Sequence, residues 1–188
     1  MGEDEGLPRL VLPMEGRDNC LGSPSARFSL VEYGDYASPH CRNVVGPVNE
    51  LVRELQDDLC FVFRNYPQPH LHPRSRPAAE AAEAAGLQGK FWLMHDRLFA
   101  HQNDLSDKAM REIARGLPVE MADFDRDLSS GAAGRRVDED LESAEEAGVG
   151  DTPTFFVNGT LRVGQYEFIP LLDALKRSAP KRRGAGPA

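Results

Sequence analysis

Hydrophobic positions along the chain change from short continuous runs to a helical spacing and back again. Residues 27–33 (RFSLVEY) and 59–66 (LCFVFRNY) are short apolar runs rich in β-forming residues, which is typical of buried strands. Between them, apolar side chains recur on one face of a helix, at Val44, Val45, Val48, Leu51, Val52 and Leu55. Because a helix joins two strands, the pattern predicts a βαβ unit with parallel strands.

The middle of the chain, from residue 77 to residue 148, has a helical pattern almost throughout. Ser106 is expected to cap one of its helices, and Gly116 follows the end of that helix. Gly148 is expected to end the last helix of the block. The predicted helices cover residues 78–85, 90–101, 106–115, 120–128 and 132–147.

Strand signals return near the C-terminus. Residues 154–157 and 160–163 flank Asn158-Gly159, a dipeptide favoured in two-residue hairpin turns. Residues 168–178 have the spacing of a closing helix. The order of a βαβ unit, a helical block, a hairpin and a helix predicts an α/β fold, with no linker that separates two independent domains.

Charge and composition narrow the class of protein. The chain has 188 residues, 40% of them hydrophobic, which is enough for one domain with a sizeable core. Its net charge of −8 and pI near 5.1 argue against nucleic-acid or anionic-membrane partners. Residues 181–188 are expected to be a solvated basic tail. The basic residues near this end are Lys176, Arg177, Lys181, Arg182 and Arg183.

Residues 1–26, rich in Gly, Pro and Ser, are expected to be an irregular lead-in. They begin with acidic residues and hold no apolar run of roughly 7–15 residues, so they do not have the pattern of a signal peptide. No run approaches the roughly 20 apolar residues that span a bilayer. Three cysteines are too few for a disulfide scaffold. We therefore expect a soluble protein in the reducing cytoplasm.

The junction between the first strand and the first helix carries the candidate chemistry, Ser38-Pro39-His40-Cys41. Serine caps free N–H groups and proline fits the first helical turn, so Ser38 and Pro39 together predict a helix start. Pro47, inside the helix, is expected to bend it. Cys41 would lie near the positive end of the helix, where a thiol can be partly ionised; the alternative is a buried, inert cysteine.

Three stretches, LVEYGDYASPHC, HPRSRPAAEAAEAAGLQGKFWLMHDRLFAHQ and GDTPTFFVNG, resemble the DsbA-like branch of the thioredoxin superfamily. The similarity is strongest to cytosolic bacterial members and to the thioredoxin-like domain appended to some sodium/proton antiporters. The resemblance implies a thioredoxin-like fold, residues 27–180, with a core of residues 27–67 and 149–180. It also implies a helical insertion of about residues 68–148, and a cis peptide bond before Pro153, beside the first helix.

The same resemblance exposes a departure, because redox members of the family have C-x-x-C where this chain has Ser38 and Cys41. Thiol–disulfide exchange needs a thiolate that attacks a disulfide sulfur, and a serine hydroxyl cannot form a disulfide. The comparison therefore implies a monothiol S-x-x-C site, with Ser38, His40 and Cys41 as its reactive residues, weak or inactive in dithiol exchange. Pro39, Thr152 and Pro153 are expected to contact a thiol- or disulfide-bearing protein.

Two other functions stay open at this level. Ser38 would donate a hydrogen bond to the thiolate of bound glutathione in a transferase of the kappa-class type, which shares this fold. Alternatively, the site is degenerate and the domain binds peptides without catalysis.

The remaining cysteines and histidines suggest little further chemistry. Cys20 is a possible partner for Cys41, and Cys60 is expected in the core. His70 and His72 have no third ligand nearby in the sequence, so we expect no metal site. No cofactor other than glutathione is suggested.

Overall fold

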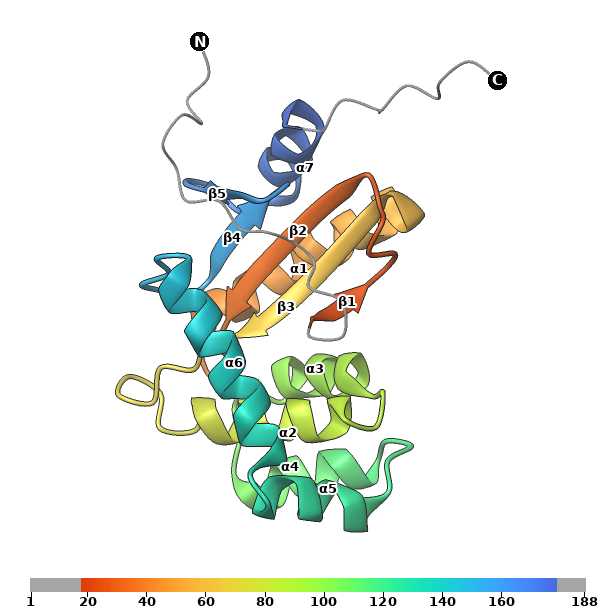
Figure 1. Cartoon of the computed structure of the whole chain (residues 1–188), viewed down its shortest axis with the longest axis vertical. Coiled ribbons are helices and arrows are strands. Elements are labelled where there is room, and N and C mark those ends of the chain that lie inside the picture. Colours follow the sequence, from red (N-terminus) through yellow and green to blue (C-terminus); the bar gives the residue numbers. More distant parts are fainter. Residues whose placement is uncertain (1–17, 179–188) are drawn as a thin grey trace.

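The computed structural model describes residues 18–178, which form a mixed five-stranded sheet with helices around it (Figure 1). The strands lie in the order β1-β3-β2-β4-β5. Strand β2 is parallel to β3, and all other neighbours are antiparallel. Within residues 18–178, no helix has both the length and the apolar character needed to cross a membrane. The strands are β1 (Asn19–Leu21), β2 (Phe28–Gly34), β3 (Leu59–Asn65), β4 (Thr154–Val157) and β5 (Thr160–Arg162).

The predicted βαβ unit is confirmed: helix α1 (Pro39–Leu55) joins β2 to the parallel strand β3. Helix α7 (Phe168–Arg177) packs beside α1, and their apolar side chains meet one face of the sheet in a single core. A second, smaller cluster covers the other face, where Tyr33 and Phe156 meet Ala144 of helix α6. The sheet is therefore buried on both faces, which explains the nearly continuous apolar sequence of β3.

The helical block lies at one end of the sheet and is joined to it through α6, which runs up to β3 (Figure 1). Helix α2 packs against both α3 and α6. Its buried positions are mainly alanines, whose small side chains allow close approach. The block consists of α2 (Ser75–Gly86), α3 (Phe91–Ala100), α4 (Asp107–Arg115), α5 (Met121–Ser129) and α6 (Ala132–Glu146).

The hairpin after the block also forms as predicted. Asn158 and Gly159 both have positive φ, 49° and 82°, which a two-residue turn of the primed type requires. The Asn158 side chain accepts a hydrogen bond from the Ser29 backbone N–H and donates to the Leu175 carbonyl. One side chain therefore joins the turn to both β2 and α7.

Two predictions were wrong in detail. Residues 19–21, expected to be irregular, form β1 against β3, because a three-residue edge strand is too short to leave a periodic pattern. Ser38 is the N-cap residue of α1, yet its side chain makes no capping hydrogen bond, whereas the Ser106 hydroxyl accepts from the Ala109 N–H. The basic tail of residues 181–188, and residues 1–17 of the lead-in, lie outside the described residues.

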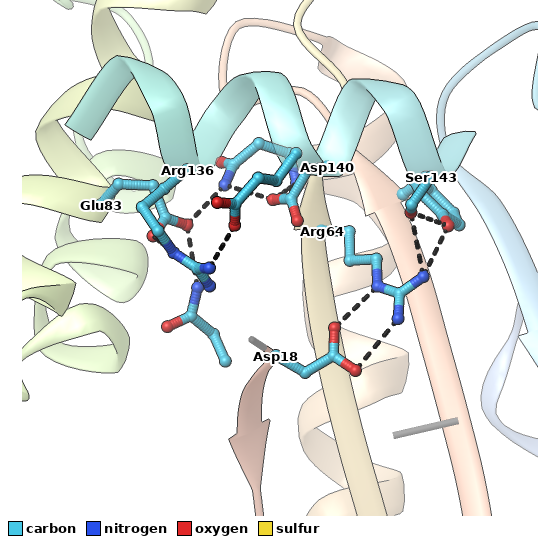
Figure 2. Close-up of polar contacts among 10 residues, drawn as sticks. Asp18, Arg64, Glu83, Arg136, Asp140 and Ser143 are labelled. Atoms are coloured by element: carbon cyan, nitrogen blue, oxygen red, sulfur yellow. Dashed lines mark hydrogen bonds and ion pairs between the residues drawn. The ribbon is translucent and has the colours of Figure 1, made fainter. Parts of the chain in front are cut away.

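A buried arginine joins β3 to its surroundings (Figure 2). The Arg64 side chain is fully buried and donates to both Asp18 carboxylate oxygens, at 2.7 and 3.0 Å. It also donates to the Tyr33 hydroxyl at 2.8 Å and to the Ser143 hydroxyl at 3.0 Å. These contacts link β3 to the segment before β1, to β2 and to α6. Such a charge stays buried because each side of the guanidinium has a partner.

A second buried cluster lies one residue further along β3 (Figure 2). One Asp140 oxygen accepts from the backbone N–H of Asn65 at 2.8 Å and from its side-chain amide at 3.0 Å. Glu83 accepts from the same amide at 2.8 Å, and Arg136 lies 3.7 Å from its other oxygen. Burial raises the pKa of Glu83 to about 8 and that of Asp140 to about 6. Helices α2 and α6 are thereby attached to the end of β3.

Removing the buried arginine should be costly. Arg64→Ala breaks the buried ion pair with Asp18, so we expect the free energy of unfolding to fall by about 3–5 kcal/mol in urea denaturation. The matched control is Arg111→Ala, because Arg111 pairs with Asp125 at the surface, where ion pairs contribute about 0–1 kcal/mol. Equal losses in the two variants would contradict the assigned role of Arg64.

Candidate redox and peptide-binding site

The S-P-H-C sequence forms the turn from β2 into α1, and only part of it reaches the surface. Pro39 and His40 are exposed, whereas Ser38 is 3% exposed and Cys41 is fully buried. Ser38 has extended backbone angles, and its carbonyl accepts the Arg42 N–H in the first helical hydrogen bond. The structure thus places the four predicted residues at one helix start but leaves both nucleophile candidates covered.

Residues that the sequence did not single out hold this turn in place. The Asp35 carboxylate accepts from the backbone N–H of Ala37 at 2.8 Å and of Gln68 at 3.2 Å. The Gln102 amide, just beyond α3, donates to the carbonyls of Tyr36 and Ser38 at 2.7 and 2.9 Å. The site loop is therefore fixed from the helical block as well as from the sheet. No local pattern in the sequence marks these long-range contacts.

The Cys41 thiol is not ionised in this setting. Burial raises its pKa to about 12, and the carboxyl group of Glu32 contributes in the same direction. Hydrogen bonds from the Asp35 N–H, 3.3 Å from Sγ, and from the side chains of Thr152 and Ser38 act against that rise but do not reverse it. Of the two alternatives for Cys41, the buried cysteine fits the structure and the partly ionised thiol does not, because desolvation outweighs the helix N-terminus at a fully buried position.

Glu32 is a buried acid beneath the site that the sequence analysis missed. It lies on β2, 3% exposed, and within the described structure its Oε1 atom has no hydrogen-bond partner. Burial raises the pKa of this carboxyl to about 8, so it holds a proton at neutral pH. A single acidic residue inside the mainly apolar strand FSLVEYG was the available signal.

The loop between α6 and β4 lies against the same helix start. Its Thr152–Pro153 peptide bond is cis. Thr152 is 6% exposed, contacts the Cys41 thiol, and donates from its hydroxyl to the Gln68 side chain at 3.3 Å. Its backbone N–H is already bonded to the Asp151 carboxylate at 2.7 Å. The structure therefore brings together the two segments that the sequence placed far apart.

An open groove of about 550 Å³ runs between this loop and α1. His40, Asn43 and Val44 line it from the helix, and Thr152, Pro153 and Tyr166 line it from the other side. Its walls combine apolar surface with polar and charged groups, among them Asp151 and Glu167. The groove is the accessible part of the site.

The other candidates do not join this site. Cys20 packs on the opposite face of the sheet from Cys41, beside Cys60, so the suggested pairing of Cys20 with Cys41 was wrong. Cys60 is buried, as expected. Residues 18–178 contain no cluster of three or more His, Cys, Asp or Glu residues suited to a metal ion, and His70 and His72 lie in the loop after β3.

Glu32 should make stability depend on pH. The folded protein keeps its proton up to about pH 8, whereas the unfolded chain releases it near 4.5, so this contribution is complete below pH 4.5 and is lost as pH rises. Between pH 5 and 7.5, wild type should lose on the order of 3 kcal/mol of unfolding free energy relative to Glu32→Gln.

Urea denaturation at several pH values measures this difference. Glu54→Gln, an exposed glutamate of α1, is the control and should run parallel to wild type. If wild type and Glu32→Gln have parallel profiles, Glu32 does not carry the proton assigned to it.

This chain is similar in sequence to several known proteins. A family model described as Thioredoxin matches residues 15–176. The Na(+)/H(+) antiporter NhaA 1 of Mycolicibacterium gilvum is 41% identical over 177 residues, which are 93% of this chain and 28% of that protein. The NhaA 1 antiporter of Salinispora arenicola is 38% identical over 95% of this chain and 27% of its own length. The chain thus spans little more than a quarter of these relatives.

Solved structures share the fold. A thioredoxin-like oxidoreductase from Silicibacter pomeroyi superposes with a TM-score of 0.76 at 29% identity, covering 87% of this chain and 92% of that one. BdbD from Bacillus subtilis superposes with a TM-score of 0.79 at 20% identity, covering 91% and 96%. The predicted α/β, thioredoxin-like fold of the DsbA-like type is confirmed, and the chain belongs to the thioredoxin family.

Proposed function

We propose that this domain is a thiol–disulfide oxidoreductase-type protein whose S-x-x-C site binds thiol- or disulfide-bearing peptide segments but is weak or inactive in dithiol exchange. The observation that carries the proposal is the open groove beside Thr152 and Pro153, next to a single, fully buried thiol. The similarity to a thioredoxin-like oxidoreductase supports the substrate class. Ser38 and the buried Cys41 account for the weak or absent dithiol exchange.

The limit follows from what thiol exchange requires. A thiolate must approach a disulfide sulfur in line, which needs both ionisation and access. Burial raises the pKa of the Cys41 thiol to about 12, far above neutral, and none of its surface is exposed. Ser38 cannot form the mixed disulfide in its place. Binding through the groove needs neither step.

Glutathione chemistry at Ser38 has less support. In that reaction the serine hydroxyl would have to face the ligand sulfur, yet Ser38 is 3% exposed and its hydroxyl contacts Cys41. Glutathione nevertheless contains a cysteinyl unit that would suit the groove, so it is a reasonable ligand without being a cofactor. The antiporter relatives carry a similar domain within a longer chain, which supports a protein partner. A cytoplasmic location stays a prediction.

Restoring the missing thiol tests whether the scaffold still accepts disulfide substrates. Ser38→Cys should form a disulfide with Cys41, because the two side chains already touch at the helix start. When dithiothreitol regenerates the dithiol, the variant should reduce insulin, whereas wild type should show little activity at this site.

The double variant Ser38→Cys, Cys41→Ala is the control, since it should form mixed disulfides and fail to resolve them. A folded Ser38→Cys protein without activity would mean that the groove no longer admits disulfide substrates. Activity in wild type that equals that of the variant would contradict the proposed inactivity of the S-x-x-C site.

Blocking the groove tests binding itself. Asn43→Trp places a large side chain on the groove wall, so the affinity for a fluorescent decapeptide with a central S-methylated cysteine should fall at least about tenfold, or ~1.4 kcal/mol. Asn49→Trp, an exposed position of α1 outside the groove lining, should bind the peptide like wild type. Fluorescence anisotropy measures both. Equal affinities would place the binding surface elsewhere.

A further inference from the structure

Two thiols meet on the sheet face that lies away from the S-x-x-C site. In the antiparallel pair of β1 and β3, Cys20 is directly opposite Val62 and Leu21 is opposite Phe61. Because side chains alternate along a strand, Cys60 points to the same face as Val62 and is the diagonal neighbour of Cys20. Both cysteines belong to the smaller core cluster, whereas Cys41 belongs to the larger one.

The two thiols have unequal surroundings. Cys60 is 1% exposed, whereas Cys20 is half-buried on an edge strand. A hydrogen bond between the two sulfurs lowers the pKa of Cys20, against the opposing effects of burial and Asp18, and raises that of Cys60. The Cys20 sulfur is also 3.5 Å from the Gly22 carbonyl oxygen. One accessible thiol therefore lies against one covered thiol, an arrangement that suits attack followed by resolution.

We propose that Cys20 and Cys60 form a reversible disulfide with each other when a small-molecule disulfide oxidises them. They would then be a second redox site, independent of Ser38 and Cys41. The Cys20 thiolate attacks one sulfur of glutathione disulfide, and the first glutathione leaves with the Cys20 proton. The glutathione adduct on Cys20 removes the hydrogen bond that raises the pKa of Cys60. The neighbouring Cys60 sulfur, as a thiolate, then attacks the sulfur of Cys20, and the second glutathione leaves with the Cys60 proton. Two protein thiols lose two electrons, and one glutathione disulfide becomes two glutathione thiols.

Closing the bond requires a movement of the edge strand. Diagonal neighbours lie about 7–8 Å apart and a disulfide joins Cα atoms about 4.4–6.8 Å apart, so β1 must move slightly toward β3. Strand β1 has three residues at the edge of the sheet, with no further strand beside it among the described residues. Gly22 follows with φ of 97°, and a Cβ there would lie 2.1 Å from the Leu59 carbonyl oxygen. A glycine thus already lets the backbone after Cys20 approach the start of β3.

Mass mapping of the intact protein tests the proposal. The chain is incubated with glutathione disulfide, blocked with iodoacetamide and digested with trypsin, which separates Cys20, Cys41 and Cys60 into peptides 18–27, 28–42 and 54–64. We expect a disulfide between peptides 18–27 and 54–64 that dithiothreitol removes. Peptide 28–42 should stay outside it. A link to peptide 28–42, or a persistent glutathione adduct on Cys20, would overturn the proposal.

Single substitutions separate the two steps. Cys60→Ala should accumulate the Cys20–glutathione adduct, because the resolving sulfur is gone, and Cys20→Ala should lose adduct formation at Cys60. An adduct on Cys60 in Cys20→Ala, or no adduct on Cys20 in Cys60→Ala, would contradict the assigned order. The wild-type map decides the pairing even if a variant fails to fold. None of these readouts uses the groove.

Discussion

The burial of polar groups at the end of β3 is the constraint on which the rest of this structure depends. The side chains of Arg64 and Asn65 are buried and donate hydrogen bonds. Their partners lie in the segment before β1 and on β2, α2 and α6. Leaving the Arg64 or the Asp18 charge buried without the other would cost far more free energy than the ion pair gains. All these elements must therefore assemble together. The helical block is held at this end of the sheet, and from there Gln102 fixes the loop that contains Ser38.

Removal from water also sets the pKa of the Cys41 thiol. Cys41 is at a helix start, which favours a thiolate, but its full burial beside Glu32 raises the thiol pKa far above neutral. Cys20 lies at a sheet edge with partial access and a sulfur neighbour, and its pKa is lowered. The pKa values of these thiols therefore follow exposure and immediate neighbours more closely than they follow the family motif. The groove at Thr152 and Pro153 is open to solvent, whereas the Cys41 thiol beside it is buried.

The elements with strong local patterns were predicted correctly, within a few residues at their ends. The apolar face of α1, the Ser106 cap and the Asn158-Gly159 turn each depend on neighbours in the sequence, so a single stretch contains their cause. Strand β1 was missed because three residues paired at an edge leave no period to detect. Glu32 was missed because the burial that raises its pKa comes from elements distant in the sequence that cover β2.

The sequence alone determined the order of elements, the βαβ unit and the replacement of the first family cysteine by Ser38, since these are properties of the chain read in order. Tertiary structure decided which groups lose contact with water. It covered Cys41, kept a proton on Glu32, set Cys20 beside Cys60 and left the groove open. The physical reason is that the free energy of an ionisable group depends on its desolvation and on its closest partners, which residues distant in the sequence supply.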